Sequence, residues 1–197
     1  MNLTLDRSNF RIFTHLDLNI YDQYRKLKGQ VFCIEQSWPI QLDMDGLTEP
    51  DVFDKYAHFF GGFDSDSKLL GAVRGISLDR HFPYRDYFSK DLTDAELCQA
   101  CESGFTLNAL LCQSTYRGIK NVSLADSQGN PTQPLTIGQA LTTLICQYFH
   151  QFAKTTCYIT AMSKTSEKFF LCNGFTPLGK VFTPDNLSIP LINMKKK

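Results

Sequence analysis

The stretch from Gly104 to Phe152 constrains the fold more than any other part of this chain. It begins with a dense apolar run, 105–111, which predicts a buried strand. The chain then breaks at Arg117-Gly118 and resumes near Gly138 with apolar positions at helical spacing. A buried strand followed by a glycine-containing helix N-terminus brings unpaired N–H groups and the positive end of the helix dipole together. We therefore expect an anion site there.

Length and composition favour one folded domain. The 197 residues, 43% of them apolar, suffice for a single core, so we predict one domain over 1–197, with an insert at 119–135 and a C-terminal extension at 183–197. The formal net charge of zero gives no general attraction to nucleic acid or to an anionic membrane, and the lysine run at 195–197 is expected to be a solvated tail.

The lack of a recognisable secretion signal and the odd number of cysteines indicate a cytoplasmic protein. The first residues lack the basic end and apolar core of a secretion signal, and no stretch approaches the roughly 18 apolar residues of a membrane span. Seven cysteines, an odd number, favour free thiols. Cys98 and Cys101 form a lone C-x-x-C that lacks the second ligand pair of a zinc site and the strand-to-helix position of a redox motif. We expect no metal site and no tightly bound cofactor.

The N-terminal half reads as a helix followed by a hairpin. An amphipathic helix is predicted within 17–35, and its apolar face carries Ile20, Tyr24, Leu27 and Val31. Arg25, Lys26 and Lys28 fall on its other faces. A strand beginning at Tyr56, a turn at 64–67 and a returning strand over 68–76 follow. The entering segment of this hairpin carries Asp51, Asp54 and His58, and the returning strand carries Arg74.

The C-terminal half alternates strands and helices. Residues 121–134 have the composition of a loop or hairpin, and a helix capped by Thr136 follows. A strand over 157–162 is predicted to run parallel to the strand at 105–111, because a helix crossover joins them. A short helix and a last strand over 175–181 complete the pattern. The fold class is α/β (α+β), with a mixed sheet of about six to seven strands flanked by helices.

The strand, loop and helix resemble the acyl-donor motif of the GNAT superfamily of acyltransferases. In that family a central strand precedes Arg-Gly-x-Gly-x-Gly/Ala, and the next helix N-terminus binds the pyrophosphate of acyl-coenzyme A. Arg117-Gly118 matches the first half of the motif and Gly138-Gln139-Ala140 the second, with 19 residues between Gly118 and Gly138. The resemblance implies a V-shaped splay between the fourth and fifth strands. It assigns acyl-donor binding to Leu110, Leu111, Cys112, Arg117, Gly118, Gly138, Gln139 and Ala140.

A second set of residues resembles the acyl-homoserine-lactone synthases and their long-chain N-acyltransferase relatives within that superfamily. The matching positions are Arg25, Phe32, Trp38, Asp51, Asp54 and Arg74. In those enzymes the two acids and the arginine form an electrostatic cluster beside the donor cleft, and the aromatic residues line the acceptor side. The resemblance thus implies an acceptor or acyl pocket made by Arg25, Phe32, Trp38, Asp51, Arg74 and Phe170.

The chain also departs from these relatives. Their Glu-x-Ser/Thr-Arg motif falls in register on Thr106, Asn108 and Ala109, so lactone formation is disfavoured. Phe170 stands where acetyltransferases of the superfamily have a tyrosine that protonates the leaving thiolate.

The predicted function is N-acyl transfer. A medium or long acyl group would pass from acyl-CoA or acyl-carrier protein, as co-substrate, to an amine of an amino acid, small metabolite or peptide. An ammonium group must first lose its proton, and His58, Asp54 and Glu102 are the candidate bases, in that order. Asn108 completes the candidate catalytic residues. An acyl carrier protein is a candidate partner, and nucleic acid is not expected. The alternatives are an acyl-homoserine-lactone-type signal synthase and a catalytically inactive domain that binds acyl thioesters.

Overall fold

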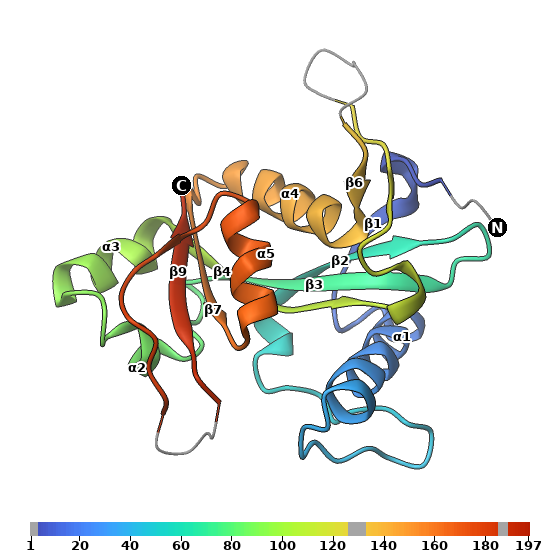
Figure 1. The fold of residues 1–197 in the computed structure, drawn as a ribbon, viewed down its shortest axis with the longest axis horizontal. Coiled ribbons are helices and arrows are strands. Elements are labelled where there is room, and N and C mark those ends of the chain that lie inside the picture. The colour runs from blue at the N-terminus through green and yellow to red at the C-terminus, as the bar shows by residue number, and fades with distance from the viewer. Residues whose placement is uncertain (1–3, 126–132, 185–188) are drawn as a thin grey trace. The chain divides into compact units, whose positions relative to one another are not determined.

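A computed structural model describes residues 4–125, 133–184 and 189–197 (Figure 1). Residues 126–132 of the predicted insert and 185–188 of the predicted C-terminal extension lie outside these ranges. The chain forms two compact units, the first containing residues up to Arg74 together with Ala109–Ile145, and the second containing Gly75–Asn108 together with Cys146–Lys197.

The chain contains both strands and helices in the described ranges. The strands are β1 (Phe10–Phe13), β2 (Ala57–Phe63), β3 (Leu69–Ser77), β4 (Gly104–Cys112), β5 (Lys120–Val122), β6 (Leu135–Thr136), β7 (Thr156–Ala161), β8 (Thr176–Pro177) and β9 (Ile192–Lys196). The α-helices are α1 (Leu18–Gly29), α2 (Arg85–Phe88), α3 (Asp94–Ser103), α4 (Ile137–His150) and α5 (Lys164–Cys172). Shorter helical segments are η1 (Arg7–Asn9), the π-helix η2 (Gln30–Glu35), η3 (Asp54–Tyr56) and η4 (Ser114–Tyr116).

Seven strands form one mixed sheet in the order β1-β2-β3-β4-β7-β9-β8, which confirms the predicted fold class. The parallel ladder joins Gly104–Thr106 of β4 to Thr156–Tyr158 of β7, in the N-terminal parts of both strands. Farther along, Ala109 of β4 has a φ of 48°, unusual for a residue other than glycine. At the other end of β7, Ala161 pairs with Ile192 of β9. The parallel ladder thus covers only the first residues of β4 and β7, and the V-shaped splay between the fourth and fifth strands stays a prediction.

The first unit is built on the packing of α1 against β1 and β2. These two strands pair antiparallel, with Phe13 opposite Phe59. The ring of Tyr24 on α1 packs edge-on against Phe59 at 4.7 Å. The helix predicted within 17–35 is confirmed, and its last turns widen into η2. Lys28, which the helical spacing places outside this apolar face, is nevertheless buried.

The insert forms a hairpin, as its composition predicted. Strands β5 and β6 pair antiparallel, with Lys120 opposite Thr136 and Val122 opposite Leu135. The N-terminal segment lies beside this hairpin: Leu5 N–H donates to Asn121 O at 2.9 Å, and Leu5 O accepts from Ser123 N–H at 2.9 Å (Figure 1). The N-terminal segment at Leu5 therefore pairs with the β5 side of the insert.

In the second unit, the C-terminal end of the chain is a sheet strand. β9 lies between β7 and β8 and pairs antiparallel with both. Lys195 and Lys196 are therefore not the expected solvated tail. Met194 and Asn193 are fully buried beside them, and Asn193 Nδ2 donates to Tyr87 O at 2.7 Å. The burial of these preceding residues draws the lysine backbone into the ladder.

Candidate active site

The end of β4 and the start of α4 meet at Gly71 of β3. A Cβ atom on Gly71 would lie 2.8 Å from Ile137 Cγ2 and 2.9 Å from Leu111 O. Such distances leave no room for a side chain, so glycine is required at this position. The predicted donor-binding residues of the strand are thus brought close to the helix N-terminus. Beyond β4, Gln113 N–H donates to Leu70 O at 2.9 Å and fixes where the strand leaves the sheet.

The hairpin rejoins the two halves of the interrupted Arg-Gly and Gly-x-Ala motif. Because Lys120 and Thr136 are ladder partners, their Cα atoms are about 5 Å apart. Only Ile119 separates Gly118 from this pair, and Gly118 takes a left-handed φ of 79° in the turn that enters it. This β5–β6 ladder brings Arg117-Gly118 and Gly138 close together despite their separation in sequence.

Thr136 caps α4, as predicted. Its hydroxyl oxygen accepts from Gln139 N–H at 3.2 Å, and Gln139 Oε1 accepts from Thr136 N–H at 3.0 Å. This reciprocal pair is a capping box. It fixes the first turn of α4, where N–H groups lack partners within the helix and the helix dipole favours an anion.

Arg117, three residues before the Lys120–Thr136 pair, is ion-paired. Its Nη2 donates to Glu35 Oε2 at 2.7 Å and to Cys112 O at 2.8 Å. Sequence reasoning missed Glu35, because a glutamate at the end of a predicted helix gives no signal of a contact with a residue so distant in the chain.

Cys112 is a poor nucleophile in this setting. Burial raises the pKa of its thiol to about 11, with Arg117 acting in the opposite direction. At pH 8 only about 0.1% of such a thiol is ionised, and the thiolate is the reactive form. A covalent acyl-cysteine step at Cys112 is therefore not favoured.

We predict that iodoacetamide modifies Cys112 much more slowly than the exposed Cys98 and Cys172 at pH 8 in the native protein. Peptide mass spectrometry over a time course gives the three rates. Equal modification of Cys112 and Cys98 would show that the Cys112 thiolate is more accessible and more stable than its burial implies.

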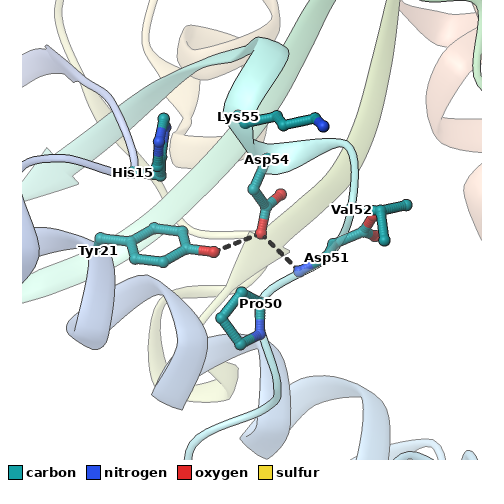
Figure 2. Close-up of a pocket in the computed structure, with 7 residues that line it drawn as sticks. All are labelled: His15, Tyr21, Pro50, Asp51, Val52, Asp54 and Lys55. Carbon is teal, nitrogen blue, oxygen red and sulfur yellow. Dashed lines mark hydrogen bonds between the residues drawn. The ribbon is translucent and has the colours of Figure 1, made fainter.

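The predicted acid and arginine cluster is assembled within the first unit. Arg74 Nη1 lies 2.6 Å from Asp54 Oδ1 and 3.0 Å from Asp51 Oδ2. Arg74 and Asp54 are each 2% exposed. The second Asp54 oxygen accepts from Tyr21 Oη at 2.5 Å and from Asp51 N–H at 3.0 Å (Figure 2). Both oxygens of Asp54 are thus engaged, which suits a positioning role better than proton transfer.

Lys28 joins the cluster from α1. Its Nζ lies 3.8 Å from Asp51 Oδ2. Burial and the nearby Arg74 lower the pKa of Lys28. Burial also raises the pKa of the Tyr21 hydroxyl, and Asp54 adds to this, so Tyr21 stays a hydrogen-bond donor. The sequence held a signal for both residues, since Tyr21, Tyr24 and Lys28 follow helical spacing on one side of α1.

The carboxyl group of Asp51 is kept ionised. Burial opposes its charge, but Arg74, the Phe53 N–H group and Lys28 outweigh burial and lower its pKa. Folding thus favours the ionised form. This stabilisation is fully present above the unfolded pKa of about 3.9 and is lost as pH falls through the lower folded pKa.

We predict that Asp51→Asn lowers the free energy of unfolding by about 1–3 kcal/mol at pH 7 and that this difference from wild type narrows below about pH 4. Urea denaturation across pH 3–7 measures it. Asp45→Asn, an exposed loop substitution, is the control. If the difference in free energy of unfolding between Asp51→Asn and wild type stays constant down to pH 3, the Asp51 charge is not the source of the stabilisation.

A cavity of about 440 Å³ opens beside the cluster. Its lining residues are His15, Tyr21, Pro50, Asp51, Val52, Asp54 and Lys55 (Figure 2). Nδ1 of His15 is buried without a hydrogen-bond partner among the described residues. Asp51 and Asp54 therefore belong both to the ion-paired cluster and to the wall of the cavity.

The other predicted acceptor residues of the first unit occupy a neighbouring segment of the chain. The rings of Phe32 and Trp38 stack at 4.6 Å with an interplanar angle of 14°. Arg25 Nε donates to Thr48 O at 2.6 Å, and its Nη1 pairs with Asp22 at 3.1 Å. Phe32 and Trp38 thus pack on each other, and Arg25 joins α1 to the loop that precedes Asp51. The assignment of these residues to an acceptor pocket stays a prediction.

Of the remaining site candidates, one lies in the first unit and three lie in the second. His58 follows the buried Ala57 on β2 and precedes Phe59; because side chains alternate along a strand, it faces away from the side on which Phe59 meets α1. In the second unit, Glu102 is exposed in the last turn of α3. Asn108 Nδ2 donates to Thr106 Oγ1 at 3.4 Å, and its Oδ1 is buried without a partner among the described atoms. Phe170 is buried against Phe175, with ring centroids 5.0 Å apart.

Within residues 4–125, 133–184 and 189–197, no cluster of three or more His, Cys, Asp or Glu side chains has an arrangement that could hold a metal ion. No helix in the same ranges has the length and apolar character needed to cross a membrane.

Comparison with solved structures defines the class of fold. No protein-family model matches the chain, and no curated protein matches it. The fold is that of the GNAT acyltransferases, which confirms the predicted resemblance at the level of fold.

Three of the similar structures illustrate the range. An acyl-CoA N-acyltransferase from Pseudomonas aeruginosa is 21% identical with a TM-score of 0.61, over 95% of this chain and 98% of that chain. The acyl-homoserine-lactone synthase LasI is 13% identical with a TM-score of 0.66, over 94% and 88%. BjaI, a CoA-dependent acyl-homoserine lactone synthase solved with SAM and isopentyl-CoA, is 12% identical with a TM-score of 0.64, over 94% and 81%.

Proposed function

We propose that this protein is an N-acyltransferase that moves an acyl group from an acyl thioester to an amine. One observation carries the proposal: Leu111 at the end of β4 and Ile137 at the start of α4 both lie against Gly71, while the hairpin rejoins Arg117-Gly118 with Gly138. A strand end beside a capped helix N-terminus suits a ligand with an extended arm and a phosphate group.

Acyl-coenzyme A is the donor that this arrangement favours, with acyl-carrier protein as the second choice. The pairing of β5 with β6 brings Gly118 close to the capped N-terminus of α4, so the interruption in sequence does not separate the two halves of the motif. The similarity to an acyl-CoA N-acyltransferase and to a CoA-dependent synthase supports the same choice. A medium or long acyl chain remains our proposal for the transferred group.

The acceptor amine is assigned to the cavity beside Asp51 and Asp54. Asp51 is held ionised and can attract a cationic amine, and Pro50 and Val52 give the same cavity apolar lining residues. The acceptor class that fits is an amine on a small metabolite, amino acid or peptide side chain.

Amide formation from a thioester does not require a strong general acid. The amine nitrogen attacks the thioester carbonyl, the C–S bond breaks, and the proton released by the amine ends on the leaving thiolate. A thiol with a pKa of about 8.5 leaves readily as the thiolate, so Phe170 in place of a tyrosine is compatible with turnover. Both oxygens of Asp54 are occupied. His58 lies on the opposite face of β2 from Phe59, which contacts Tyr21 of the cavity wall, so neither side chain is placed to take a proton directly from an amine bound there.

Mass spectrometry of the products tests the proposal. The purified protein is incubated with acyl-CoA and acyl-carrier-protein donors of graded chain length against a panel of amines. An amide product that depends on the protein supports the assignment. Donor binding without any product would favour the catalytically inactive alternative, and a lactone made from S-adenosylmethionine would favour a signal synthase, which Thr106 and Ala109 argue against.

A further inference from the structure

Arg117, the cation of the proposed donor loop, is paired with an acid that the loop does not supply. The Glu35 carboxylate lies 2.7 Å from Arg117 Nη2, and the two side chains are 22% and 50% exposed. The same Nη2 also donates to Cys112 O, so the guanidinium is held at the end of β4. A phosphate bound here would therefore lie near both a carboxylate, Glu35, and a guanidinium, Arg117.

The position of Glu35 is built into the fold. Glu35 ends the π-helix η2, in which Gln36 N–H donates to Val31 O at 3.2 Å. Ser37 then takes a left-handed φ of 55°, and Trp38 N–H returns to Phe32 O at 2.8 Å. π-helical turns are rare and are frequent at functional sites. The segment that stacks Trp38 on Phe32 thus also presents Glu35 to Arg117.

The pair changes the charge that a donor meets. Alone, Arg117 would attract each phosphate near the start of α4, but Glu35 cancels that charge and repels the same group. The electrostatic repulsion between Glu35 and the donor grows with the number of phosphates that the donor carries. Coenzyme A carries a pyrophosphate and a 3′-phosphate, whereas the 4′-phosphopantetheine arm carries one phosphate.

We propose that Glu35 is a specificity residue that weakens the binding of multiply phosphorylated donors and so narrows the preference for coenzyme A over a phosphopantetheine arm. This inference rests on the proposed function, because it places the donor at the end of β4 and the start of α4. It adds that Glu35, beside Arg117, changes the relative affinity for coenzyme A and for a phosphopantetheine arm.

The test compares wild type with Glu35→Gln and with Glu49→Gln, the same change at an exposed loop glutamate. Isothermal titration calorimetry measures the affinity of each protein for coenzyme A and for 4′-phosphopantetheine at low and high salt. Glu35→Gln is expected to tighten coenzyme A binding about threefold or more, to tighten phosphopantetheine binding less, and to lose most of this gain at about 1 M salt. Glu49→Gln is expected to bind as wild type does.

The outcomes separate this inference from the proposed function. If all three proteins bind coenzyme A with equal affinity, the role of Glu35 is overturned and the donor site survives. If Glu35→Gln tightens both ligands equally, Glu35 does not discriminate between carriers and the inference is again overturned. If none of the three binds either ligand, the donor site is wrong, and the inference fails with it.

Discussion

Replacing Arg74 with alanine is expected to lower the free energy of unfolding by about 3–5 kcal/mol. Arg74 is 2% exposed and pairs with Asp54 at 2.6 Å and Asp51 at 3.0 Å. Its removal leaves two carboxylates facing each other in a buried site, together with the Tyr21 hydroxyl that donates to one of them. Urea denaturation at pH 7 measures the loss.

Arg117→Ala is the matched control for Arg74→Ala. It also removes an arginine from a short ion pair, but its side chain is half exposed, so we expect a loss of at most about 1 kcal/mol. The double variant Arg74→Met with Asp54→Asn should recover part of the stability lost in the single variants, because it leaves fewer unpaired charges. Equal losses from Arg74→Ala and Arg117→Ala would contradict the buried-cluster account.

Gly138→Asp is expected to weaken the binding of a medium-chain acyl-CoA by at least about tenfold. The substitution puts a carboxylate in the first turn of α4, where the account places the donor phosphates, and like charges a few ångströms apart repel by about 1–4 kcal/mol. Titration calorimetry gives the change in dissociation constant.

The folded state should tolerate this change. An acid in the first turn of a helix interacts favourably with its dipole, and replacing glycine raises helix propensity, so the melting temperature is expected to hold or rise. Thr143→Asp adds the same side chain to an exposed position farther along α4 and should leave donor affinity within about twofold of wild type. If Gly138→Asp binds acyl-CoA as wild type does, the phosphates lie elsewhere.

Much of the fold was predictable because its strongest signals are local. The apolar run at 105–111 and the helical spacing after Thr136 identified β4 and α4, and cap chemistry gave the start of α4. Strand β9 was missed because Lys195 and Lys196 read as a solvated tail. Its buried residues, Ile192 to Met194, are too few to signal a strand without the partner β7.

The site was predictable only in part, because its contacts join distant segments. Resemblance to known enzymes placed Asp51, Asp54 and Arg74 together, and the structure brings them within ion-pair distance. The composition of the insert predicted a loop or hairpin, but it did not show that Lys120 and Thr136 would pair and bring the two halves of the donor motif together. Lys28 and Glu35 were missed because charged helix residues are ordinarily assigned to solvent.

The most direct test of the account is a crystal structure of the protein with a non-hydrolysable thioether analogue of acyl-CoA. Pyrophosphate oxygens are expected within hydrogen-bond distance of N–H groups in the first turn of α4, and the pantetheine arm is expected to run beside residues 109–112 of β4. A ligand bound away from both elements, with its phosphates remote from Gly138, would contradict this expectation.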